Sequence, residues 1–207
     1  MLGKALPYHR FCHHCLRLHW VYTADLPGTI YRSCLGTKDQ IRFYSGYSIA
    51  HRHVQIAMKY YSLGDPHTSL LKKILRRHTR YKSDIASLSF KSIAEPVVAN
   101  HKFVLKSQYK FHKTGTRLSF EQIHHTRVFI CPHLVCDNNV TRLDHGLWTA
   151  ALHGFREAEE YGSSFPRLHS CRCCPTDYSV LVQNGEVTID FWQDLGSGIQ
   201  LVDQIFL

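Results

Sequence analysis

A pair of cysteines near the C-terminus, followed directly by a well-marked β-hairpin, constrains the fold of this chain more than any other feature. The spacing Cys171-x2-Cys174 lets two thiolates on one tight turn reach a single tetrahedral metal ion. Apolar and more polar residues then alternate over residues 178–182 and again over 187–191. Asn184-Gly185 between them favours a two-residue turn, because both residues tolerate positive φ. The sequence therefore predicts a metal-binding turn anchored to two antiparallel strands.

We interpret the cysteines as metal ligands because nothing in the sequence indicates secretion. The N-terminus lacks the apolar run of a signal peptide, and no stretch approaches the roughly 20 apolar residues of a membrane-spanning helix. Eight cysteines in a reducing compartment, cytoplasmic or nuclear, favour metal over disulfides. A disulfide-rich secreted protein is the competing interpretation. The apolar fraction of 44% is large enough for a folded core.

Two further groups of cysteine and histidine precede this pair. Near the N-terminus, Cys12-x2-Cys15-x3-His19 offers two thiolates and an imidazole, and Cys34 follows as a candidate fourth ligand. In the middle of the chain, Cys131-x-His133 leads out of a predicted strand, with Cys136 close behind. A single Cys-x2-Cys pair also fits two buried cysteines or a redox pair, but two such pairs in one chain favour zinc.

These residues allow two groupings of zinc ligands. In the first, which we prefer, one site consists of Cys12, Cys15, His19 and Cys34, and the other of Cys131, His133, Cys171 and Cys174. In the second, the two Cys-x2-Cys pairs join as a single zinc ribbon. Cys136 and Cys173 are then spare or alternate ligands.

The rest of the chain predicts an α+β fold with a mostly antiparallel sheet and packed helices. Apolar spacing predicts helices from Ser48 to Gly64, from Asp65 into a basic run at residues 72–82, and over residues 143–161. Alternation predicts strands over residues 85–90, 103–112 and 127–130. We expect one domain, with a Cys-x2-Cys and helical part at about 1–83 and a sheet and zinc-knuckle part at about 84–207.

The net charge of +9 is unevenly distributed. Residues 1–129 contain 21 Lys/Arg and 6 Asp/Glu, a net charge of +15, whereas residues 130–207 contain 4 and 10, a net charge of −6. The candidate nucleic-acid contacts are one helix face and one strand face: Lys72, Lys73, Arg76 and Arg77, with Lys106 and Lys110. Phosphate binding needs several cations on one surface, although most basic helix faces are simply solvated.

Five short motifs also carry a resemblance to a known group of proteins. They are Cys12-x2-Cys15-x3-His19, Tyr47-Ser-Ile-Ala-His51, Ile130-Cys-Pro-His-Leu134, Cys171-x2-Cys174-Pro-Thr-Asp-Tyr178 and Trp192-x-Asp-Leu-Gly196. In this order they resemble uncharacterised, F-box-like proteins of filamentous fungi, which usually carry an F-box that docks on ubiquitin-ligase scaffolds. No F-box is visible in this sequence. The resemblance implies a protein partner and a substrate-recognition role in a ubiquitin-ligase-like assembly.

No catalytic motif accompanies the cysteines. The sequence contains no P-loop, no GxSxG, no HExxH and no zinc-deaminase pattern. Sites with three or four thiolates are more often closed and structural, whereas hydrolytic sites keep an open coordination position. We therefore expect a non-enzymatic, zinc-stabilised protein-interaction module rather than a metal-dependent hydrolase. The alternative is a zinc-containing nucleic-acid-binding protein that uses its basic helix and strand face.

Overall fold

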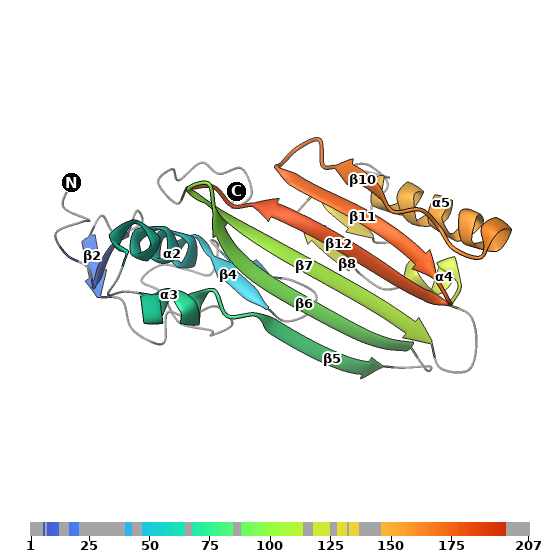
Figure 1. Cartoon of the computed structure of the whole chain (residues 1–207), viewed down its shortest axis with the longest axis horizontal. Helices are drawn as coiled ribbons and strands as arrows, with labels where there is room; N and C mark the ends of the chain where they lie inside the picture. Colours follow the sequence, from blue (N-terminus) through green and yellow to red (C-terminus); the bar gives the residue numbers. More distant parts are fainter. Residues whose placement is uncertain are drawn as a thin grey trace. The chain divides into compact units, whose positions relative to one another are not determined.

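Long antiparallel strands dominate the computed structural model of the chain (Figure 1). The structure describes residues 6, 8–12, 17–20, 40–42, 47–64, 68–84, 88–113, 118–124, 128–131, 133–136 and 146–197. The six strands of the main sheet are β5 (His78–Asp84), β6 (Leu88–Ala99), β7 (Lys102–Lys113), β10 (Arg167–Ser170), β11 (Thr176–Gln183) and β12 (Glu186–Asp194). Their order in the sheet is β10-β11-β12-β7-β6-β5, so β10 and β5 form its edges.

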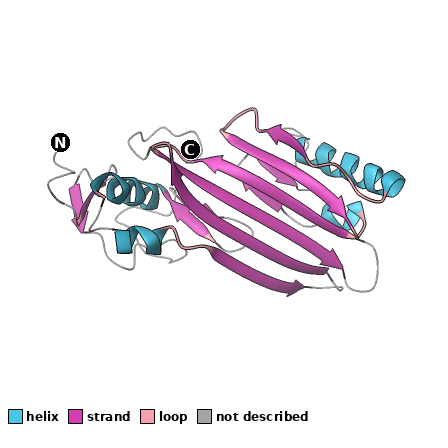
Figure 2. Ribbon diagram, in the orientation of Figure 1, coloured by secondary structure: helices cyan, strands magenta, loops and turns pink. Residues whose placement is uncertain are grey.

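Helices and three small hairpins complete the described part of the chain (Figure 2). The helices are α2 (His51–Leu63), α3 (Thr68–Ile74), α4 (Phe120–His124) and α5 (Gly146–Tyr161). The hairpins pair β1 (His9–Cys12) with β2 (Arg17–Trp20), β3 (Gln40–Arg42) with β4 (Ser48–Ala50), and β8 (Val128–Cys131) with β9 (Leu134–Cys136). This arrangement confirms the predicted α+β class with a mostly antiparallel sheet. None of the described helices is long and apolar enough to cross a membrane.

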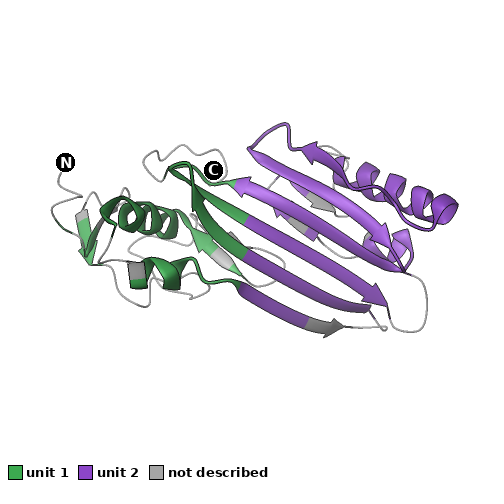
Figure 3. Cartoon of the chain, in the orientation of Figure 1, with its two compact units in different colours: residues 1–77, 95–105, 194–207 green, residues 78–94, 106–193 purple. Residues whose placement is uncertain are grey.

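The chain forms two compact units (Figure 3). Unit 1 consists of residues 1–77, 95–105 and 194–207, and unit 2 of residues 78–94 and 106–193. The units interleave along the sequence, because β6 and β7 contribute residues to both. The expected organisation as one domain, with parts at about 1–83 and 84–207, stays a prediction.

The core of unit 2 lies against one face of its strands. The Phe90 ring packs 5.1 Å from Phe111 and 5.5 Å from Tyr109, and Tyr109 lies 5.0 Å from Phe191 between ring centres. Buried and less buried side chains alternate along β7 and β12, as the sequence predicted. Helix α5, which lies within the helix predicted over residues 143–161, packs against β11 and buries Leu147, Ala151 and Phe155.

Gly154 shows why α5 carries a residue with poor helix propensity in its middle. A Cβ atom at this position would lie 3.1 Å from Cγ2 of Val182 and 3.6 Å from Oγ of Ser164. Ser164 in turn holds β11, because its N–H donates to the Val182 carbonyl (2.8 Å) and its Oγ accepts from the Val182 N–H (2.7 Å). The close approach of helix and strand therefore favours glycine here, because an added Cβ would have to displace the Val182 side chain by a few tenths of an ångström.

The predicted C-terminal hairpin is confirmed in detail. Asn184 and Gly185 have φ values of 52° and 75°, which a two-residue turn of this kind needs. The register runs from Gln183 opposite Glu186 to Thr176 opposite Gln193. One face of both strands is buried, so the register also fixes which side chains enter the core.

Several predicted elements need correction. The basic run at 72–82 does not follow one helix, because α3 ends at Ile74 and the chain turns into β5. Arg80 lies in β5 and is paired with Ser92 of β6. The helical spacing of apolar residues ends at Leu75, and pairing with β6 determines the conformation from His78 onward. The strand predicted over 85–90 begins at Leu88 in the described residues and extends to Ala99. The edge strand β10 and the hairpin of β1 and β2 were not predicted.

Candidate metal centre

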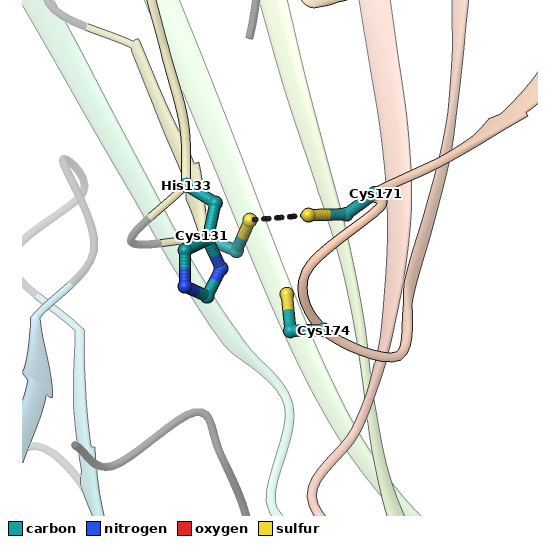
Figure 4. Close-up of side chains that lie close together, drawn as sticks. All are labelled: Cys131, His133, Cys171 and Cys174. Atoms are coloured by element: carbon teal, nitrogen blue, oxygen red, sulfur yellow. Dashed lines mark hydrogen bonds between the residues drawn. The ribbon is translucent and has the colours of Figure 1, made fainter. Parts of the chain in front are cut away.

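Two tight turns of unit 2 bring four candidate ligands together (Figure 4). Cys131 ends β8 and lies opposite Leu134 of β9, with His133 in the turn between them. Cys171 and Cys174 lie in the connection between β10 and β11, directly after the pair Ser170 and Asp177. Each hairpin thus presents two ligands at its end, and backbone pairing holds both turns in shape.

The spacing of the ligand atoms fits one shared ion. The nitrogen or sulfur ligand atoms of Cys131, His133, Cys171 and Cys174 all lie within 4.8 Å of one another, close enough to coordinate a metal ion. The Sγ atoms of Cys131 and Cys171 are 3.9 Å apart, and both thiols are free. Two thiolates on one zinc ion, at about 2.3 Å each and a tetrahedral angle, lie about 3.8 Å apart. A disulfide would need about 2.05 Å. The distance therefore matches metal coordination.

Hydrogen bonds fix the turn that carries Cys171 and Cys174. The Cys171 N–H donates to the Thr176 carbonyl (2.8 Å), and the Thr176 N–H donates to the Cys174 carbonyl (2.7 Å). The Cys173 N–H points at Cys171 Sγ (3.4 Å), and the Thr176 hydroxyl lies 3.2 Å from Cys174 Sγ. Donors of this kind stabilise thiolates. Sequence reasoning missed Thr176, although a hydroxyl two residues after a candidate ligand is a usable signal.

The three buried thiols influence one another's protonation. A hydrogen bond from Cys131 lowers the pKa of Cys174, and a hydrogen bond from Thr176 adds to this effect. The same bond and burial raise the pKa of Cys131, and burial raises the pKa of Cys171. Cys174 is therefore the first of the three to become a thiolate. Because the pKa values of Cys131 and Cys171 are raised, a metal ion that binds them must displace their protons.

The imidazole of His133 supplies an independent test of the fit. Its Nδ1 atom is buried and has no hydrogen-bond partner among the described residues. Buried polar atoms in folded proteins are normally paired, so an unpaired one needs an explanation. Figure 4 shows the ring on the same side of the turn as the sulfur atoms. A metal ion in the cluster would give this nitrogen a partner, and the imidazole also lies close enough to Cys174 to help lower the pKa of that thiol.

The donor set is typical of a closed site. Three thiolates and one imidazole fill the four positions of a tetrahedral ion, as in structural zinc sites. The described part of the chain adds no carboxylate to this cluster. Asp177, the nearest acidic residue along the chain, is exposed and accepts a hydrogen bond from Ser170 (2.6 Å). Within the described residues, the cluster thus contains no free base beside the ligands.

The other predicted ligands fall into two groups. Cys173 is exposed and does not belong to the cluster, which agrees with its assignment as a spare residue. His19 lies in β2, opposite Arg10 of β1. Cys15 and Cys34, and the side chains of Cys12 and Cys136, lie outside the described residues. The N-terminal site therefore stays a prediction, while the four residues of the preferred C-terminal grouping lie close enough to coordinate one metal ion.

The structure also places the candidate nucleic-acid contacts. The four cations Lys72, Lys73, Arg76 and Arg77 are exposed, whereas Ile74 between them is only 2% exposed. The four cations are thus accessible to solvent, although Arg76 and Arg77 follow the helix α3 rather than belong to it. Lys106 is exposed and Lys110 is half-buried on β7.

Comparison with known proteins adds no relative. No protein-family model, no curated protein and no solved structure matches the chain. The F-box-like resemblance therefore stays an expectation from short motifs. What the fold and the site define is an α+β protein with a three-cysteine, one-histidine cluster able to coordinate a metal ion.

Proposed function

We propose that the chain is a non-enzymatic protein-interaction module whose fold is stabilised by a zinc ion bound to Cys131, His133, Cys171 and Cys174. The observation that carries this proposal is the closed set of four ligands at the ends of two hairpins. Zinc is the ion that best suits tetrahedral coordination by thiolate and imidazole. Because all four positions are taken by the protein, the ion has a structural role.

The ion would join parts of unit 2 that are distant in sequence. Cys131 and Cys171 are 40 residues apart, and each belongs to a different hairpin. The hairpin of β8 and β9 has few residues, and an isolated two-stranded hairpin is only marginally stable in water. Coordination ties it to the turn at the start of β11, and so to the main sheet.

Exposed apolar side chains near this turn support a protein partner. Tyr161, Phe165 and Leu168 are 64%, 65% and 70% exposed, and they lie close together in the sequence just before the turn. Leu168 belongs to β10, an edge strand of the sheet. Edge strands and exposed apolar groups are common features of protein-binding surfaces. The substrate-recognition role in a ubiquitin-ligase-like assembly is supported by the sequence resemblance alone.

Elemental analysis of the purified chain tests the metal. We expect one zinc per chain from this site, and a second if the N-terminal site forms. Whatever fraction of the double variant Cys171→Ser/Cys174→Ser stays soluble should lose one equivalent, whereas the matched control Cys173→Ser should keep it. Cobalt substitution then reports the coordination number. Folded protein without metal, or a five-coordinate cobalt site with an exchangeable water, would contradict a structural zinc centre.

A matched pair of surface variants tests the protein-binding role. Phe165→Glu/Leu168→Glu changes the exposed apolar group beside the zinc turn. Tyr81→Glu changes an equally exposed residue, 70% exposed, on the opposite edge strand β5. Quantitative mass spectrometry should show a co-purifying protein that the first variant loses and the second retains. Equal recovery with parent and both variants would argue against this surface.

A further inference from the structure

A second surface, separate from the metal centre, is the basic run formed by Lys72, Lys73, Arg76 and Arg77. All four side chains are exposed, and the whole run belongs to unit 1. The sequence contains no acidic residue from Pro66 to Ser83. Among the described residues, no ion pair joins any of these four cations to a carboxylate. The run is therefore a concentration of positive charge that the fold itself does not neutralise.

The fold leaves these cations accessible to solvent, whereas another side of α3 is packed. The helix packs against α2, and Ile74 is almost fully buried. Lys72 and Lys73 lie in α3, and Arg76 and Arg77 follow its end, so all four cations lie within six residues of chain. Backbone hydrogen bonds from the Leu75 N–H to the Leu71 carbonyl (2.9 Å) and from the Arg76 N–H to the Lys73 carbonyl (3.4 Å) hold the chain close to the end of the helix. The apolar side of the helix stabilises the fold, and the basic side remains for a partner.

We propose that the basic run binds the phosphate backbone of nucleic acid without reading its sequence. The closely spaced phosphates of nucleic acid match the spacing of four neighbouring cations. Each of the two arginine guanidinium groups can donate two parallel hydrogen bonds to phosphate oxygens. No Asn, Gln or aromatic residue lies between Leu70 and Arg77, so the run offers no side-chain amide and no aromatic ring for recognising bases. Helices that lie on membranes present an apolar face to lipid, whereas here that face is packed against α2.

The strand face that the sequence suggested fits this partner less well. Lys106 and Lys110 lie on β7 on the same face as Gln108, which donates a hydrogen bond to Asp190 of β12 (2.8 Å). On the same face His112 pairs with Glu186 at 3.5 Å. Acidic groups thus lie among these cations. The helix run is the stronger site, and the lysines of β7 serve as a control.

Fluorescence anisotropy with a labelled duplex of random sequence tests the proposal on the full, zinc-loaded chain. Four phosphate contacts predict a slope of about −3.6 in log affinity against log salt, or about 150-fold weaker binding at 200 mM than at 50 mM salt. Replacing all four residues with glutamine should abolish this salt-dependent binding. The partial variant Arg76→Gln/Arg77→Gln should reduce the slope by about 2.

A matched control separates a local site from net charge. The control variant replaces four cations of unit 2 with glutamine: Lys106, Lys110, Lys113 and Arg156. It removes the same number of positive charges and should leave the slope of log affinity against log salt unchanged. Equal loss in both variants, or no binding by the parent at 50 mM salt, would overturn the proposal. So would stronger binding to vesicles containing anionic lipid than to DNA, lost in the first variant. Zinc content, measured in every variant, shows separately whether the metal centre is intact.

Discussion

Replacing Cys174 with serine removes a ligand that no neighbouring side chain can replace. Cys174 is buried, and its Sγ lies in the cluster with the Thr176 hydroxyl 3.2 Å away. Cys173, one residue earlier, is exposed, and only its backbone N–H contacts the cluster. We therefore expect Cys174→Ser to unfold or aggregate the protein, with the same outcome for Cys171→Ser, and Cys173→Ser to be tolerated.

The size of the effect follows from the energy of structural zinc sites. Such sites contribute about 10–16 kcal/mol of apparent binding free energy, against a total of about 5–15 kcal/mol for the stability of a typical domain. An equal share for one of four ligands is about 2.5–4 kcal/mol, a large part of that stability. For a chain of this size, 1 kcal/mol corresponds to about 2–4 °C in Tm. A variant that still folds should therefore melt about 5–16 °C below the parent.

Thermal melting of the parent and the three serine variants, with and without a chelator, measures this difference. The chelator should lower the Tm of the parent and of Cys173→Ser by similar amounts, and should leave Cys174→Ser unchanged. If Cys174→Ser melts like the parent and the chelator has no effect on either, the metal-centred account of this fold is wrong.

Three further outcomes are expected. In a competition titration, zinc affinity should fall by about 100-fold or more from pH 8 to pH 6. The cause is that the Cys131 and Cys171 thiols, whose pKa values are raised, must lose their protons to bind zinc. Equal affinity at both pH values would contradict this. Gly154→Val should lower the free energy of unfolding in urea by about 1–3 kcal/mol, because its side chain would overlap Val182. Gly185→Ala should cost about 1–2 kcal/mol in the same assay, because φ at this residue is 75°.

Local signals explain why the C-terminal hairpin was predictable from sequence. Alternation specifies a strand with one buried face, and Asn184-Gly185 specifies the turn that joins two such strands. Both signals depend only on neighbouring residues. The same holds for α5, whose buried residues recur at helical spacing.

The elements that were missed depend on contacts between distant residues. In β10, Leu168 is exposed and no residue is fully buried, so its strand conformation comes from pairing with β11 rather than from an apolar pattern. In β5, polar residues follow a helix directly, and only pairing with β6 shows where the strand begins. Glycine at position 154 disfavours a helix when the sequence is considered alone. The reason for its presence, the close contact with Val182, is visible only in the folded chain.

The composition of the ligand set was predictable, and the preferred grouping is the one that the structure brings together, but the sequence left a second grouping open. Spacing identified Cys171 and Cys174 as one pair, and the strand before Cys131 identified that turn as a candidate partner. Whether these turns meet depends on the positions of β8, β9, β10 and β11 in space. Sequence spacing carries no information on that, which is why a ribbon of the two Cys-x2-Cys pairs remained an alternative.

The separation of the two ligand turns along the chain also affects the unfolded protein. An ion held by Cys131 and Cys171 closes a loop of 40 residues. In the chain-entropy model, a cross-link of that length raises the free energy of the unfolded state by about 4 kcal/mol, because it lowers the conformational entropy of the unfolded chain. Helix α5 lies inside this loop. If the chain binds its metal early in folding, α5 would therefore be confined to a short closed loop, and fewer positions would be open to it before it docks.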